Sequence, residues 1–142
     1  MFSHLLPNVE LLYLVSFNEY SNRNFCKSFE KKHGKRFWEI TKQAIVDDLS
    51  RINRKLQLTQ QVDELWHKDD YWVFKHDFSV VGTKTSPKVS GNRCLCYLDN
   101  QKKTIEVLMV FNHQDLPKNM NETQYLRSIL DSQFPEITSK FC

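Results

Sequence analysis

Residues 93–111 have the sequence RCLCYLDNQKKTIEVLMVF, and this stretch decides the fold. Residues 93–98 alternate between two sets of side chains, and residues 104–111 form a second, almost wholly apolar run. The residues between them, Asp-Asn-Gln-Lys at 99–102, are of the polar kind that makes turns. A period of two on both sides of a turn predicts a β-hairpin.

Two further strands are predicted earlier in the chain. Residues 71–75, YWVFK, alternate between an aromatic face and a face carrying Val and Lys. Residues 11–17 are apolar at most positions, which is typical of a strand that is covered on both faces or central in a sheet. Residues 82–91 contain two Gly, one Pro and four hydroxyl residues, a composition that predicts a mobile loop.

Helical spacing replaces this alternation between residues 22 and 56. An apolar stripe at helical steps follows Gly34 and consists of Trp38, Ile45, Leu49, Ile52 and Leu56. Because Gly34 is typical of a helix end, we expect a helical hairpin whose second arm covers 35–56. The acidic stretch 59–70 is predicted as a connection, with at most a short helical turn.

The end of the chain predicts one more helix. Asn121 and Gln124 have the spacing of a capping box, and apolar residues follow up to Pro135. The expected fold is therefore α+β: a small antiparallel sheet, an N-terminal helical hairpin packed on one face, and a short C-terminal helix. A length of 142 residues fits a single domain over 1–142, and the order of residues 1–9 is left open.

Composition argues against membrane and metal proteins. No apolar run approaches the roughly 18 residues that span a bilayer, and no basic segment or cleavage site marks a signal peptide. We therefore expect a cytoplasmic protein. Cys94 and Cys96 are two apart on a predicted strand, and no second cysteine pair gives zinc-ligand spacing. They are predicted as core residues, with no metal and no cofactor.

The net charge of +3 conceals two basic segments. Residues 23–55 carry ten Lys or Arg against four acidic residues, which is common on a solvated helix face. Residues 75–103 carry six Lys or Arg against two acidic residues, and this segment is predicted to be strand and loop. The basic residues of that segment that lie close to a single acid, Asp77, are Lys75, Lys84, Lys88 and Arg93. A localised basic surface of this kind favours binding of a polyanion such as nucleic acid.

Common catalytic motifs are missing. The loop 82–91 lacks the G-K-[ST] ending of a phosphate-binding loop, and neither G-x-S-x-G nor H-E-x-x-H occurs. Nucleotide hydrolysis, serine hydrolase and zinc protease activities are therefore not predicted. The remaining chemistry lies in basic and titratable side chains on one predicted sheet.

At this point the sequence resembles the RelE/ParE superfamily of toxin–antitoxin toxins, over roughly residues 10–20 and 35–134. The segments that carry the resemblance are YWVFK (71–75), GNRCLCY (91–97), EVLMVFNH (106–113) and the C-terminal helix with Tyr125. The resemblance implies an mRNA-cleaving toxin, ribosome-associated, that uses no metal and is neutralised by a cognate antitoxin. In such chemistry the RNA 2′-hydroxyl attacks the adjacent phosphodiester.

The residue types present can fill the roles that this reaction needs. Arg93 fits a bidentate phosphate clamp, and Lys75 can stabilise developing charge or act as a base. His113 is the candidate acid or base, because a histidine titrates near neutral pH. Tyr97 and Tyr125 are candidates for stacking on an RNA base. Each residue also has a plain structural alternative, such as a surface ion pair between Lys75 and Asp77.

The sequence departs from the resembling family in its length, in a larger loop at 79–92, and in His113 and Gln114 where many members carry Arg. The larger loop suggests that Lys84 and Lys88 contact RNA from a flap. Two alternative functions remain open: a non-nuclease toxin of the same fold that acts on DNA gyrase, and a non-catalytic module that binds nucleic acid or a protein partner.

Overall fold

The computed structural model describes residues 13–52 and 62–141. The elements, in chain order, are β1 (Leu14–Phe17), α2 (Glu19–Ser21), the π-helical turn η2 (Asn22–Cys26), α3 (Lys27–His33), α4 (Lys35–Ser50), β2 (Val62–Lys68), β3 (Tyr71–Asp77), α6 (Pro87–Ser90), β4 (Asn92–Asp99), β5 (Thr104–Asn112), the short turn η3 (His113–Asp115), α7 (Glu122–Gln133), α8 (Pro135–Thr138) and η4 (Ser139–Phe141). Residues 1–9, whose order the sequence left open, fall outside the described residues.

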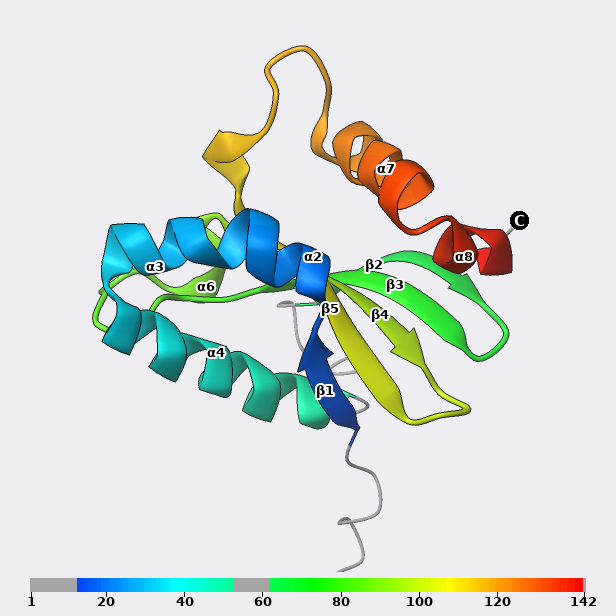
Figure 1. Cartoon of the computed structure of the whole chain (residues 1–142), viewed down its shortest axis with the longest axis horizontal. Coiled ribbons are helices and arrows are strands. Elements are labelled where there is room, and N and C mark those ends of the chain that lie inside the picture. Colours follow the sequence, from blue (N-terminus) through cyan, green and yellow to red (C-terminus); the bar gives the residue numbers. More distant parts are fainter. Residues whose placement is uncertain (1–12, 53–61, 142) are drawn as a thin grey trace, which may run out of the picture.

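The five strands form one sheet in the order β1-β5-β4-β3-β2 (Figure 1). The predicted hairpin is confirmed as β4 and β5, which pair antiparallel from Asn92 opposite Asn112 to Asp99 opposite Thr104. Strand β1 differs from the expectation in two ways: it lies parallel to β5, with Leu14 opposite Thr104, and it is an edge strand instead of a covered or central one. A parallel pair requires a long connection, and here the chain between β1 and β5 contains α2 to α4 and the strands β2 to β4.

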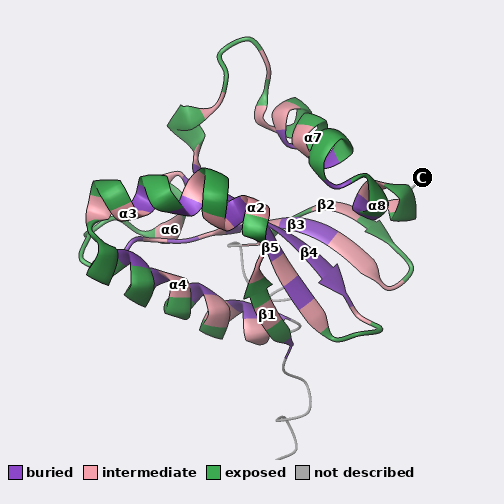
Figure 2. Cartoon of the chain, viewed as in Figure 1, coloured by how far each residue is buried: buried purple, intermediate pink, exposed green. Residues whose placement is uncertain are grey.

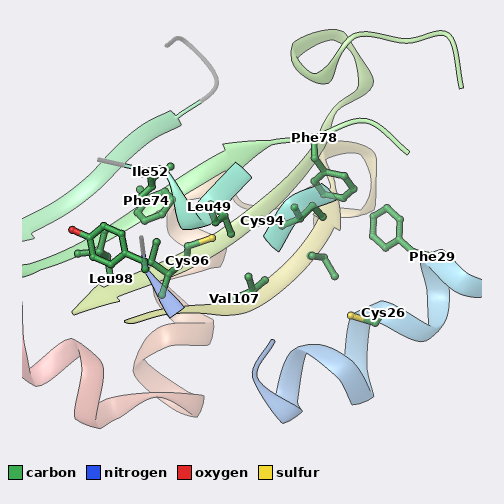
Figure 3. Packing of buried hydrophobic residues seen from close by; sticks show 14 of the residues in the cluster. Cys26, Phe29, Leu49, Ile52, Phe74, Phe78, Cys94, Cys96, Leu98 and Val107 are labelled. Atoms are coloured by element: carbon green, nitrogen blue, oxygen red, sulfur yellow. The ribbon is translucent and has the colours of Figure 1, made fainter. Parts of the chain in front are cut away.

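The predicted helical hairpin covers one face of this sheet. Gly34 has a φ of 91°, a conformation that glycine adopts without strain, and it separates α3 from α4. The buried side of α4 faces the sheet and includes Trp38, Ile45 and Leu49. Figure 3 shows Leu49 and Ile52 among strand residues that include Phe74 and Cys96. Helix α4 ends at Ser50, earlier than the predicted residue 56, and 53–56 lie outside the described residues.

The C-terminal helices cover the opposite face (Figure 1). Leu126 and Leu130 of α7 are buried and pack with Leu95 and Met109 of the sheet. The predicted capping box is confirmed, because the side chains of Asn121 and Gln124 each accept a hydrogen bond from the other's backbone N–H. Figure 2 shows exposed residues along the outer sides of α4 and α7, so the sheet lies between two helical layers. The α+β class is therefore confirmed.

Strand β2 corrects the prediction of a connection at 59–70. It pairs antiparallel with β3 through a two-residue turn in which Asp69 has a positive φ of 54°. Because β2 is an edge strand, many of its side chains face solvent, and charged residues such as Asp63 and Glu64 conceal its period of two. Residues 59–61 of that predicted connection lie outside the described residues.

The loop after β3 contains the short helix α6, and hydrogen bonds from serine side chains to backbone carbonyls hold the loop together. Ser79 Oγ donates to the Thr85 carbonyl at 2.6 Å, and Ser90 Oγ donates to the Phe78 carbonyl at 2.7 Å. The predicted core position of Cys94 and Cys96 is confirmed, since both are free thiols in the buried cluster. Burial raises the pKa of the Cys94 thiol. None of the helices in the described ranges is long and apolar enough to cross a membrane.

Candidate active site

The three predicted catalytic side chains meet on the sheet face that α7 covers. Lys75 lies on β3, Arg93 lies on β4, and His113 directly follows β5. Asp77 is the register partner of Arg93, and Lys75 is two residues before Asp77, so Lys75 and Arg93 are diagonal neighbours on one face. Arg93 is in turn opposite Phe111 on β5. The antiparallel register therefore brings together residues that are far apart in the sequence.

A carboxylate that the sequence analysis missed lies at the centre of this group. Glu122, the first residue of α7, accepts hydrogen bonds from all three side chains. Its Oε1 is 3.0 Å from Arg93 Nη1 and 3.2 Å from His113 Nδ1. Its Oε2 accepts a hydrogen bond from Lys75 Nζ. The arrangement is an anion-binding site made by β3, β4 and the residue that follows β5, and α7 supplies the anion.

The Glu122 carboxylate is stabilised in its charged form. Its side chain is only 12% exposed, and burial by itself would raise its pKa. The hydrogen bonds from Lys75 and His113 and the charges of Lys75 and Arg93 outweigh burial, so the pKa of Glu122 lies below its ordinary value. At neutral pH the Glu122 carboxylate is therefore ionised and carries a full negative charge.

Two further carboxylates, both on strands of the sheet, form ion pairs with Lys75 and Arg93. Arg93 Nε donates to Asp77 Oδ1 at 3.2 Å, and Lys75 Nζ lies 3.5 Å from Asp63 Oδ2. The structural alternative of an ion pair between Lys75 and Asp77 is not what the structure shows, because Lys75 pairs with Asp63 and Glu122. Burial raises the pKa of Asp77, and the charge and hydrogen bond of Arg93 counter it only in part.

The position of His113 is set by a network at the end of β5. Asn112 Nδ2 donates to the Ser90 carbonyl at 3.1 Å and to Asn92 Oδ1 at 2.8 Å. The backbone N–H of His113 donates to the Gly91 carbonyl at 2.8 Å. These bonds connect the end of β5 to the start of β4, while the imidazole remains 61% exposed. His113 is therefore held at its backbone and accessible at its ring.

The other predicted site residues lie elsewhere. Lys84 and Lys88 are exposed on the loop that ends at Gly91, and neither joins the Glu122 cluster. Tyr97 is 8% exposed within the core cluster below α7, and burial raises the pKa of its hydroxyl. Its ring therefore has no open face for stacking in this conformation. Tyr125 is half-buried on α7, three residues after Glu122 and so on the same side of the helix.

No three His, Cys, Asp or Glu side chains are placed to hold a metal ion in the parts of the chain that the structure describes. The chemistry of the cluster itself is that of an anion site, because Lys and Arg donate hydrogen bonds and carry positive charge. Asp77, Asp63 and Glu122 lie far from one another in the sequence, and only Asp77 neighbours a predicted site residue on its own strand. The position of Asp77, two residues after Lys75 on the same strand, was the single sequence signal that pointed toward this network.

No protein-family model and no curated protein matches the chain. A solved structure does. The crystal structure of the archaeal RelE–RelB complex from Pyrococcus horikoshii OT3 matches with a TM-score of 0.46 and 16% sequence identity, over 74% of this chain and 99% of that chain. At this level the match is a similarity of shape and assigns no family or function to this chain.

Proposed function

We propose that this protein is a metal-independent endoribonuclease of the toxin–antitoxin type that cleaves mRNA. One observation carries the proposal: Lys75 on β3, Arg93 on β4 and His113 directly after β5 donate to one carboxylate at hydrogen-bond distance. A carboxylate presents two oxygens to these donors, much as a phosphodiester presents its two non-bridging oxygens. The cluster thus has the donors that a scissile phosphate needs.

The proposed reaction is an internal transfer at phosphorus. The 2′-oxygen of the RNA forms a bond to the adjacent phosphorus, and the bond from phosphorus to the 5′-oxygen of the next nucleotide breaks. A base takes the proton of the 2′-hydroxyl, and an acid gives a proton to the leaving 5′-oxygen. The products are a 2′,3′-cyclic phosphate and a 5′-hydroxyl end, and no water or metal enters the balance.

The three side chains divide these tasks by their chemistry. Arg93 clamps the non-bridging oxygens, since a guanidinium offers a fixed fork of donors and its position is set by Asp77. Lys75 and His113 are the two groups that can exchange protons with the 2′- and 5′-oxygens. The exposed His113 ring can reach a bound RNA, whereas Lys75 at 12% exposure faces the interior of the cluster.

The proposed partners follow from the same surface. A cognate antitoxin would cover the basic face, and mRNA on the ribosome in the cytoplasm would be the target. The sequence resemblance to RelE/ParE toxins suggests both. Lys84 and Lys88 are proposed to contact RNA from the loop beside Gly91, which is the residue that fixes the backbone of His113.

The test is expression of the chain in bacteria, with growth, translation and mRNA 5′ ends followed over time. We expect rapid mRNA cleavage that is lost in Arg93→Ala and His113→Ala, while Arg23→Ala, which removes an exposed arginine paired with Glu19, cleaves normally. DNA damage with intact mRNA would instead indicate the gyrase-directed function. Intact mRNA and normal growth would contradict a toxin.

A further inference from the structure

We propose that Glu122 is a displaceable internal ligand that occupies the phosphate position of the candidate active site, so that RNA binds only after this carboxylate has left. This inference rests on the proposed function and concerns the regulation of the same site. Three features carry it: the donors that Glu122 uses, the charge balance around it, and the way α7 is anchored.

The donors that Glu122 uses are those that the proposed reaction requires. Arg93 Nη1 and His113 Nδ1 both point at its Oε1, and Lys75 Nζ donates to its Oε2. A phosphate cannot take the same hydrogen bonds while the carboxylate is present. Docked Glu122 and a bound scissile phosphate are therefore mutually exclusive.

The charge balance points the same way. With Glu122 in place, the cations Lys75 and Arg93 face three carboxylates, because Asp63 and Asp77 also contact them. Such a site does not attract a further anion. Removal of Glu122 leaves two cations with two carboxylates, so the net charge of the site rises by one unit. The Nδ1–H of His113 then has no carboxylate to donate to and is available to a phosphate.

The anchoring of α7 permits that removal without loss of the core. The first fully buried residue of the helix is Leu126, and Leu130 follows one turn later. Between η3 and Leu126 every residue is exposed or half-buried, and Figure 1 shows this connection looping away from the sheet. The first turn of α7 can thus open while Leu126 and Leu130 stay packed, as low-stability helix ends do.

The experiment measures binding of a single-stranded 2′-O-methyl RNA, which lacks the attacking hydroxyl and cannot be cleaved. Fluorescence anisotropy compares the intact chain with Glu122→Gln and with Glu136→Gln, an exposed glutamate on α8 whose change alters net charge equally. We expect Glu122→Gln to bind about 5- to 20-fold more tightly, and Glu136→Gln to differ from the unchanged chain by less than about twofold. The salt dependence of log Kd should steepen by about 0.7 in Glu122→Gln alone, because one more phosphate contact forms.

Equal or weaker binding by Glu122→Gln, with a native circular dichroism spectrum, would overturn the proposal. If Glu122→Gln does not fold, Glu122→Asp replaces it, since this change keeps the charge and draws the oxygens back by one methylene. It should bind more tightly than the unchanged chain, and unchanged or weaker binding would again overturn the proposal.

A second measurement separates this inference from the nuclease function. Inorganic phosphate is titrated into the chain and into Glu122→Gln, and the ring signals of His113 are followed by NMR. We expect the signals to shift at lower phosphate concentration in Glu122→Gln. That result without any RNA cleavage would remove the nuclease function and leave the internal ligand standing. RNA cleavage by the unchanged chain, with identical phosphate titrations in both proteins, would remove the internal ligand alone.

Discussion

Asp77 and Arg93 face each other across β3 and β4 in direct register, and Arg93 Nε donates to Asp77 Oδ1 at 3.2 Å. This pair leaves the Nη1 end of the guanidinium free to reach Glu122 at 3.0 Å. One end of Arg93 is thus held by the sheet, and the other end is directed at the anion position.

Arg93→Lys should lower the rate of RNA cleavage by about 100- to 1000-fold, almost as much as Arg93→Ala. An ammonium is a point charge and cannot bond Asp77 and a phosphate through a planar fork. Single-turnover cleavage of a short RNA measures the decrease, with Arg23→Lys as the matched surface change. Retention of more than a third of the activity in Arg93→Lys would show that charge alone suffices.

Asp77→Asn should change the free energy of unfolding by less than about 1 kcal/mol at pH 7, because burial disfavours the Asp77 charge and offsets its ion pair. Since its pKa is raised above the ordinary 3.8, the stabilising contribution of this carboxyl is present below that value and is lost as pH rises through the folded pKa. Cleavage should nevertheless fall about tenfold, as Arg93 loses its fixed orientation. Urea unfolding and cleavage rates on one preparation test both statements, and unaltered cleavage would contradict the positioning role.

His113→Ala should lower cleavage about 100- to 10,000-fold, the usual range for a general acid or base. The fold should tolerate this change, because the imidazole is 61% exposed and the residue is held through its backbone N–H. Thermal unfolding should therefore shift by no more than about 3 °C. A full cleavage rate in His113→Ala would remove the residue from the reaction and leave Lys75 to exchange the protons.

Glu122→Gln should destabilise the fold by about 1–2 kcal/mol at pH 7, because charged hydrogen bonds at a mostly buried site are replaced by weaker ones. The folded pKa of Glu122 lies below its ordinary value of 4.5. Its stabilising effect is therefore complete above 4.5 and disappears as pH falls through the folded pKa. Urea unfolding of both proteins from pH 7 to pH 3 should show a difference that shrinks only below about 4.5. A constant difference across that range would assign the effect to packing instead of charge.

Lys84→Ala with Lys88→Ala should weaken binding of 2′-O-methyl RNA about 3- to 10-fold. The salt slope should fall by about 1.4, because each phosphate that a lysine neutralises on a single strand contributes about 0.7. Stability should not change, because both side chains are exposed. The matched control removes Lys102 and Lys103 at the far end of the β4–β5 hairpin. Identical binding by both double variants would exclude a special role for the loop at 79–92.

The sequence predicted the parts of the fold whose periodicity is strong. The hairpin of β4 and β5, the break at Gly34 and the capping box at Asn121 all appear where they were expected. Strand β2 was missed because an edge strand needs only part of its side chains to be apolar. The parallel pairing of β1 depends on long-range topology, which local periodicity does not contain.

Of the residues that form the site, the sequence predicted the hydrogen-bond donors but not the carboxylate that they contact. Lys75 and Arg93 lie on strands whose alternation places them, His113 directly follows a strand, and the structure brings all three together. Glu122 could not be predicted, because its role depends on how the first turn of α7 lies over the sheet. The burial of Tyr97 has the same origin, since the C-terminal helices pack on the sheet face that strand alternation alone leaves open.

The parallel pairing of β1 with β5 also limits when this protein can acquire its structure during synthesis. Leu14 is paired with Thr104, so the first strand to leave the ribosome waits for its partner until most of the chain has been made. Glu122 emerges later still. A nascent chain paused between these points would present Lys75 and Arg93 to nearby ribosomal RNA without their internal carboxylate.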